Sequence, residues 1–95
     1  MTQILTYEDI KKFNNDGAIL LKDKFKKKWI VKLRSGIKNA KIKPSPRFTN
    51  HTKDKNTPSY LEDFWTWNLH EEFRDFVFNS PTAKIASELL NAKKI

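Results

Sequence analysis

The sequence contains no cysteine. Disulfide bonds and thiolate metal sites are therefore excluded, and the redox compartment is left open. Long apolar runs are also missing, because the longest, Ala18–Leu21, is far shorter than the about 20 residues that a membrane-spanning helix needs. The first ten residues lack the basic stretch followed by an apolar stretch that marks a signal peptide. We therefore expect a soluble cytoplasmic protein.

Arginine is scarce, although the chain is basic. The formal net charge is +8, but only three of the nineteen basic residues are arginine. Residues 1–55 carry fifteen basic and five acidic residues, whereas residues 56–95 carry four and six. A basic half can bind nucleic acid or anionic lipid, yet arginine is favoured for bidentate contacts with phosphates and bases. The composition therefore argues against nucleic acid as a partner.

Aromatic residues, in contrast, make up 13% of the chain, which is enough to seed the core of one small domain. Most of them lie in the segment 44–78, together with both histidines. Any site chemistry of this chain is therefore expected in that segment.

Local signals predict a helix and a strand near the N-terminus. Thr6 is a predicted N-cap, and Asp9, three residues later, can complete a capping box. Asp16-Gly17 is typical of a left-handed helix end. The apolar residues Ala18–Leu21 are then predicted to form a short buried strand.

A second helix is predicted to complete a helix-strand-helix unit over residues 1–42. Asp23 can cap it, Gly36 weakens its last turns, and Pro44 ends it at the latest. Its apolar positions recur at helical spacing. They are Phe25, Trp29, Ile30, Leu33 and Ile37.

Residues 43–59 contain three prolines and many turn-forming residues, so a long loop, functional or disordered, is predicted there. Residues 60–95 are predicted to hold the aromatic segment and two further helices. One is capped by Asn68, with Glu71 reaching back, and the other starts at Ser80-Pro81. The expected fold class is mainly helical α+β, with four main helices and one or two short strands in a single small domain.

Several of these features recur together in one known family. They are the Asp16-Gly17 turn into an apolar segment, the W-x-x-x-L pattern of Trp29 and Leu33, and the string PSPRFTNHTKD with EDFWTW. A later pattern, F-x-x-F-x-F-x-S-P-x-A-x-I-A-x-x-L-L, runs from Phe73 to Leu90. Over nearly its whole length, and in the same order, the chain resembles the N-terminal region of phytanoyl-CoA dioxygenase-like proteins.

This resemblance implies an oxygenase that depends on iron(II) and 2-oxoglutarate and is built on a double-stranded β-helix. In the family, an H-x-D/E pair and a distant histidine hold the iron, and these motifs lie C-terminal to the region matched here. The resemblance therefore implies the helical N-terminal part of such an enzyme without its barrel. The complete enzyme would hydroxylate a small organic substrate, and this chain would be catalytically incomplete.

The residues themselves argue against an iron site. Two histidines and a carboxylate must meet at one point to form such a site. His70-Glu71-Glu72 is formally H-x-E, but residues two apart on a helix point about 200° apart. His51 is the other histidine, and its nearest acid is Asp54. We expect no metal ligand and no catalytic residue, with His70 solvated at a helix start and His51 in a polar loop.

A weak substrate site is the remaining prediction in this segment. Its candidates could contact an acidic substrate or wall a pocket, and they are Arg47, His51, Lys53, Trp65 and Trp67. An extended segment would place the two tryptophans on one face, although such a pair is more often part of a core. The loop residues are at least as easily explained as solvated surface.

Two hypotheses for the whole chain stay open. In the first, it is an incomplete oxygenase whose exposed apolar helix faces lead to self-association or to pairing with the missing C-terminal barrel. In the second, it is a stand-alone basic helical module that binds an anionic partner such as nucleic acid.

Overall fold

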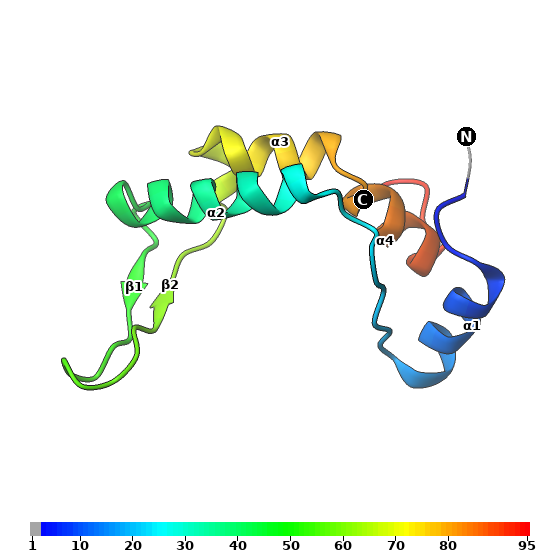
Figure 1. Cartoon of the computed structure of the whole chain (residues 1–95), viewed down its shortest axis with the longest axis horizontal. Helices are drawn as coiled ribbons and strands as arrows, with labels where there is room; N and C mark the ends of the chain where they lie inside the picture. Colours follow the sequence, from blue (N-terminus) through cyan, green and yellow to red (C-terminus); the bar gives the residue numbers. More distant parts are fainter. Residues whose placement is uncertain (1–2) are drawn as a thin grey trace.

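The computed structural model describes residues 3–95 and is mainly helical, as predicted. Figure 1 shows an open arch in which two helices lie side by side along the middle, a β-hairpin extends from one end and the N-terminal helix lies at the other. The elements are α1 (Tyr7–Asp16), α2 (Lys27–Ile42), β1 (Thr49–Asn50), β2 (Leu61–Glu62), the 3-10 helix η1 (Thr66–Asn68), α3 (Glu71–Asn79) and α4 (Thr82–Leu90).

The arch is much more open than a typical small domain. Its radius of gyration is 16.3 Å, whereas a compact chain of this length has a value of about 12 Å. The accessible surface is 7993 Å², compared with roughly 5,700 Å² for a compact protein of this mass. Only three apolar residues in the described part are buried, and they are Leu5, Trp29 and Ile85. The chain therefore has only a small core of its own.

Helix α1 begins and ends as its sequence predicts. Thr6 accepts a hydrogen bond from the Asp9 amide at 3.1 Å, and the Asp9 carboxylate accepts one from the Thr6 amide at 3.0 Å. These bonds with Thr6 lower the pKa of Asp9 below its ordinary value. Gly17 ends the helix at φ 76°, in the left-handed region where glycine is favoured.

The side chain of Glu88 in α4 joins the segment before α1 to the C-terminal helix. Its carboxylate accepts hydrogen bonds from the Ile4 and Leu5 amides at 3.0 and 2.8 Å. Partial burial opposes ionisation, but these amide bonds prevail and lower the pKa of Glu88. The first and last helices are thus joined by a polar contact that spans more than eighty residues of sequence.

The segment Ala18–Leu21 is not a strand, contrary to the prediction. Its backbone has no pairing partner among the described residues, and Leu20 is 80% exposed. A strand needs a neighbour to accept and donate its backbone hydrogen bonds, and the one ladder in residues 3–95 lies in the hairpin. Apolar character alone was therefore insufficient to predict a strand here.

Helix α2 starts later than predicted. Asp23 is no cap, because it adopts a left-handed conformation at φ 58°, and Lys26 precedes the helix without a side-chain bond. Phe25 therefore lies outside the helix, where its ring stacks on that of Phe76 with centroids 5.6 Å apart. The predicted end was correct, since α2 stops at Ile42, two residues before Pro44.

Helices α2 and α3 pack against each other and form the middle of the arch. Trp29 meets Phe76 edge to face, with centroids 6.1 Å apart. Gly36, predicted only to weaken α2, lies buried at this contact, and a Cβ atom there would lie 2.9 Å from the Phe73 ring. Lys32 forms an ion pair with Asp75 beside it. The glycine is required for the close approach of the two helices.

Residues 43–59 are mostly irregular, as predicted, but Thr49–Asn50 form a short strand, so the segment belongs to a β-hairpin that was not predicted. β1 and β2 run antiparallel, with Thr49 opposite Glu62 and Asn50 opposite Leu61. The His51 amide adds a hydrogen bond to the Tyr60 carbonyl at 2.7 Å. The middle of the segment is therefore paired with Tyr60–Glu62, which lie in the predicted aromatic segment.

Helices α3 and α4 form in the predicted places, but their starts differ. Asn68 is not the cap of α3, because it belongs to η1, and His70 precedes the helix without a side-chain cap bond. At α4 the boundary lies one residue later than predicted. Pro81 is the residue before the helix, and the Ser80 hydroxyl accepts a hydrogen bond from the Thr82 amide at 3.2 Å.

Candidate functional site

The base of the hairpin is held by one carboxylate. Asp63 accepts hydrogen bonds from the Ser45 amide at 2.9 Å, from the Ser45 hydroxyl, and from the Phe64 amide at 2.9 Å. Ser45 is buried. Partial burial opposes ionisation of Asp63, but the hydrogen bonds with Ser45 prevail and lower its pKa. Asp63 thus joins the segment after α2 to the strand that returns from the hairpin.

Arg47 and Trp65, two of the predicted site residues, come together beside this base. The Arg47 Nε donates to the Phe64 carbonyl at 3.1 Å. Its guanidinium carbon lies 5.4 Å from the Trp65 ring centroid and 5.9 Å from that of Phe64. Both rings are more than half exposed. The Arg47 guanidinium therefore lies over two aromatic rings at the surface, and cation–π attraction stabilises this position of the side chain.

The two tryptophans do not form the pair predicted from their spacing. Trp65 has φ 62°, in the left-handed region, so the segment is not extended and the two rings are not displayed as on a strand. Trp65 is 61% exposed and is not part of a core. Trp67 is half-buried, meets Phe78 edge to face at 5.8 Å and lies under the Arg74 guanidinium.

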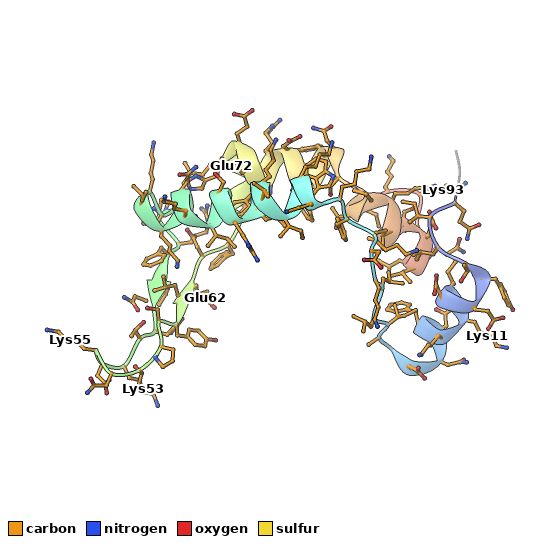
Figure 2. The ribbon with its side chains drawn as sticks, in the orientation of Figure 1. Lys11, Lys53, Lys55, Glu62, Glu72 and Lys93 are labelled. Atoms are coloured by element: carbon orange, nitrogen blue, oxygen red, sulfur yellow. The ribbon has the colours of Figure 1, made fainter. Side chains whose placement is uncertain are left out.

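His51 and Lys53 lie farther along the hairpin. The His51 Nε2 is 3.4 Å from a Glu62 carboxylate oxygen, and its ring meets Tyr60 edge to face at 5.2 Å. Lys53 is exposed near the tip, as Figure 2 shows. The five predicted site residues therefore divide between the base of the hairpin, its far end and the surface of α3. They do not form one site.

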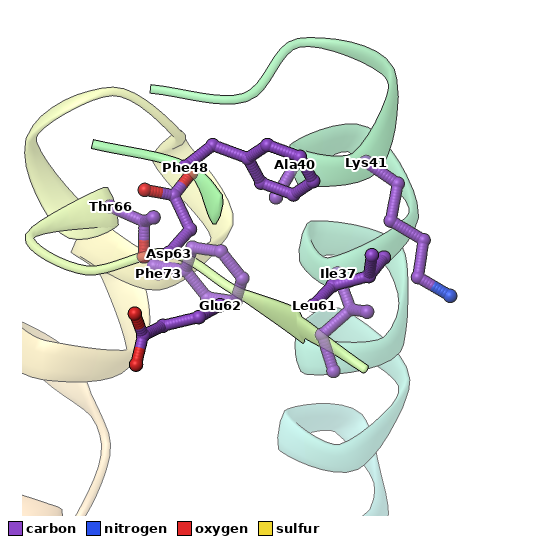
Figure 3. Close-up of a pocket in the computed structure, with 9 residues that line it drawn as sticks. All are labelled: Ile37, Ala40, Lys41, Phe48, Leu61, Glu62, Asp63, Thr66 and Phe73. Atoms are coloured by element: carbon purple, nitrogen blue, oxygen red, sulfur yellow. The ribbon is translucent and has the colours of Figure 1, made fainter. Parts of the chain in front are cut away.

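The structure has a pocket that the sequence analysis missed. It measures about 240 Å³ and lies where the hairpin leaves the end of α2. Figure 3 shows apolar side chains turned toward one another, while the Lys41 ammonium and the Glu62 carboxylate point away on opposite sides. Its lining consists of Ile37, Ala40, Lys41, Phe48, Leu61, Glu62, Asp63, Thr66 and Phe73.

None of the predicted site residues lines this pocket. Its volume is below the roughly 300 Å³ at which ligand sites usually begin. Two carboxylates belong to its lining, but that of Glu62 points away and that of Asp63 is already held by Ser45. The signal that could have found the pocket is the apolar stripe of α2, since Ile37 was already predicted to lie on an apolar face.

His70 is not solvated, contrary to the prediction. It is 8% exposed, and its Nε2 lies 2.9 Å from the Lys43 carbonyl oxygen. A carbonyl only accepts hydrogen bonds, so this nitrogen carries the proton. The contact joins the end of α2 to the start of α3, which gives the buried histidine a role in holding the two helices together.

The described residues contain no group of three His, Cys, Asp or Glu side chains close enough to hold a metal ion. Within residues 3–95, no helix has both the length and the apolar character needed to cross a membrane. Comparison with protein-family models, curated proteins and solved structures found no match. The family resemblance noted from the sequence therefore stays a prediction.

Proposed function

We propose that the chain is the helical N-terminal portion of a phytanoyl-CoA dioxygenase-like oxygenase. The complete enzyme would use iron(II) and 2-oxoglutarate to hydroxylate a small organic substrate, and these 95 residues are catalytically incomplete. The observation that carries the proposal is the open arch, which exposes far more surface than a compact protein of its mass.

The exposed surface includes many large apolar side chains. On α2, the hairpin and α3, the apolar residues that are more than one-third exposed are Ile30, Val31, Ile37, Ile42, Tyr60, Leu61, Phe64, Trp65, Val77 and Phe78. Extensive apolar surface of this kind marks a contact with another protein part. In the proposal, the barrel of the complete enzyme covers it, and without the barrel the chain associates with itself.

The iron of the family does not fit the residues of this chain. His51 lies beside Glu62 on the hairpin, while the His70 Nε2 is occupied by the Lys43 carbonyl. Glu72, two residues after His70, bonds to Asn39 of α2. The two histidines are therefore engaged in separate contacts, and in the proposal the iron ligands come from the barrel.

The gene provides the first test. We expect the DNA beyond codon 95 to encode, in this frame or a shifted one, an H-x-D/E motif within a few dozen codons. The longer protein, made from these 95 codons joined in frame to the downstream sequence, should consume oxygen in the presence of iron(II) and 2-oxoglutarate. The 95-residue chain should not.

A second measurement reports on the apolar surface. A dye that fluoresces on apolar surfaces should bind the 95-residue chain and bind the longer protein much less, because the barrel covers the arch. Turnover of 2-oxoglutarate by the 95-residue chain, or downstream DNA without such a motif in any frame, would refute the proposal.

A further inference from the structure

The outward side of α2 carries a row of four cations. We call Lys27, Arg34, Lys38 and Lys41 the basic row, and all four are exposed. With 3.6 residues per turn, their spacing places them within an arc of about 60°, and the row is about 21 Å long. Helix α2 contains no acidic residue. The row is therefore an uninterrupted strip of positive charge on a rigid element.

Acidic neighbours do not neutralise this strip. Among residues 3–95, the ion pairs of lysine are those of Lys32 with Asp75 and of Lys84 with Glu88, and neither lysine belongs to the basic row. Lys32 lies on the side of α2 that faces α3. Glu72 of α3 also meets that side, through Asn39. The carboxylates of α3 thus act on the inner side of α2 and leave the outer side positive.

We propose that the basic row binds the phosphate backbone of nucleic acid without reading base sequence. Cations aligned along one side of a helix can each approach a phosphate of the same backbone, and each contact releases condensed counterions. The scarcity of arginine argues against bidentate recognition of bases, but a lysine is an adequate point charge for a phosphate. This binding goes beyond the oxygenase proposal and is inferred for the 95-residue chain, in which no barrel covers the outward side of α2.

An anionic membrane fits this surface less well. A helix that lies in a bilayer interface inserts a free apolar face. The apolar side of α2 instead packs on α3 through Trp29 and Gly36. The exposed apolar residues of α2 are Ile30, Val31, Ile37 and Ile42, and they border the basic row on both sides without forming one continuous apolar face. Because α2 offers positive charge but no free apolar face that could insert into a bilayer, a polyanion in solution is the favoured partner.

Salt dependence provides the direct test. A fluorescein-labelled 20-base-pair duplex and a 20-nucleotide single strand are titrated with the 95-residue chain between 50 and 200 mM NaCl, with fluorescence anisotropy as the readout. Four phosphate contacts predict a slope of log K against log salt of about −3.6 for the duplex and about −2.8 for the single strand. Binding that does not weaken with salt would overturn the proposal.

Two triple variants of equal net charge show whether the row itself is responsible. One is Lys27→Gln/Arg34→Gln/Lys38→Gln. The matched control is Lys11→Gln/Lys12→Gln/Lys93→Gln, and these three residues are exposed and lie outside α2, with Lys11 and Lys93 at the α1 end of the arch (Figure 2). The row variant should lose about a hundredfold in duplex affinity at 100 mM NaCl, and its slope should fall to about −0.9. The control should keep most of its affinity.

Equal losses in both variants would show that net charge, and not the row, drives binding, and the proposal would be wrong. Row-dependent binding to phosphatidylserine-containing vesicles that exceeds duplex binding at the same salt would also overturn it in favour of a membrane. Circular dichroism checks that each variant is folded. If the triple variant unfolds, Lys38→Gln alone should reduce the size of the slope by about 0.9, and an unchanged slope would contradict the proposal.

Discussion

The α2–α3 pair and the hairpin of residues 43–65 are held by different forces. The helix pair is joined by aromatic packing of Trp29 against Phe76 and by the close approach at Gly36. The hairpin has strands of two residues each, and its base depends on the hydrogen bonds between Ser45 and Asp63. Burial of apolar surface contributes far more free energy than exposed polar contacts do.

This difference predicts a hierarchy of local stability. Segments with few buried apolar contacts open at lower free energy than the core does. The hairpin should therefore open while the helix pair remains folded, whereas damage to the helix pair should unfold the whole arch.

Removing the central tryptophan should have the largest effect. Trp29→Ala removes a buried ring at the helix contact, and such a change typically costs about 3–5 kcal/mol. We expect the variant to be largely unfolded at 25 °C by circular dichroism. Val31→Ala, on the exposed side of the same helix, should change the free energy of unfolding by less than about 0.5 kcal/mol. Equal effects of the two changes would contradict the assignment of the core.

Crowding the helix contact should have a smaller effect. In Gly36→Val, the added side chain meets Phe73 and Glu72, and overpacking of this kind costs about 1–3 kcal/mol. The free energy of unfolding in urea should fall accordingly. Ser35→Val places the same side chain on the neighbouring, exposed position and serves as the control. A Gly36→Val protein as stable as this control would show that the helices can separate without loss.

Loosening the hairpin should leave the helix pair intact. Asp63→Asn removes the charge that accepts bonds from Ser45. Hydrogen exchange at the His51 amide, which bonds to Tyr60, should become faster, while the amides of α2 keep their protection. Asp16→Asn, which changes an exposed carboxylate at the end of α1, is the control and should change little. Equal acceleration in the hairpin and α2 would mean that the two regions unfold together.

Acid provides the subtlest test of the hairpin base. The pKa of Asp63 lies below its ordinary value of 3.8, because the hydrogen bonds with Ser45 outweigh the effect of partial burial. A carboxyl group with a lowered folded pKa stabilises the fold above its unfolded pKa, and this stabilisation is lost as the pH falls through the folded pKa. The stability difference between Asp63→Asn and the unsubstituted chain, measured in urea, should therefore narrow as the pH drops below 3.8. A difference independent of pH would contradict this role.

Predictions from the sequence succeeded where the signal is local. The cap at Thr6 and the stop at Gly17 depend on residues within a few positions, so the limits of α1 were predicted correctly. The predictions for Ala18–Leu21 and Asp23 were wrong, because a strand needs a partner and the backbone at Asp23 takes a left-handed turn.

In the candidate site, too, the features that could not be predicted depend on residues far apart in the sequence. Arg47 and Trp65 do meet, although their contact depends on the pairing of β1 with β2, which was not predicted. The burial of His70 could not be predicted, because it rests on the Lys43 carbonyl, which lies 27 residues away. The pocket beside Ile37 likewise combines α2 with both arms of the hairpin.

The sequence by itself determined the helical character, the capped ends of α1 and the positive charge of α2, which contains no acidic residue. These features depend on neighbours along the chain. The tertiary structure alone decided which side of α2 is free. Contact with α3 engages Lys32 and Gly36 on the inner side and leaves the basic row in solvent. Long-range packing also decided the open arch, because the contact between α2 and α3 buries Trp29 but leaves many apolar residues of both helices exposed.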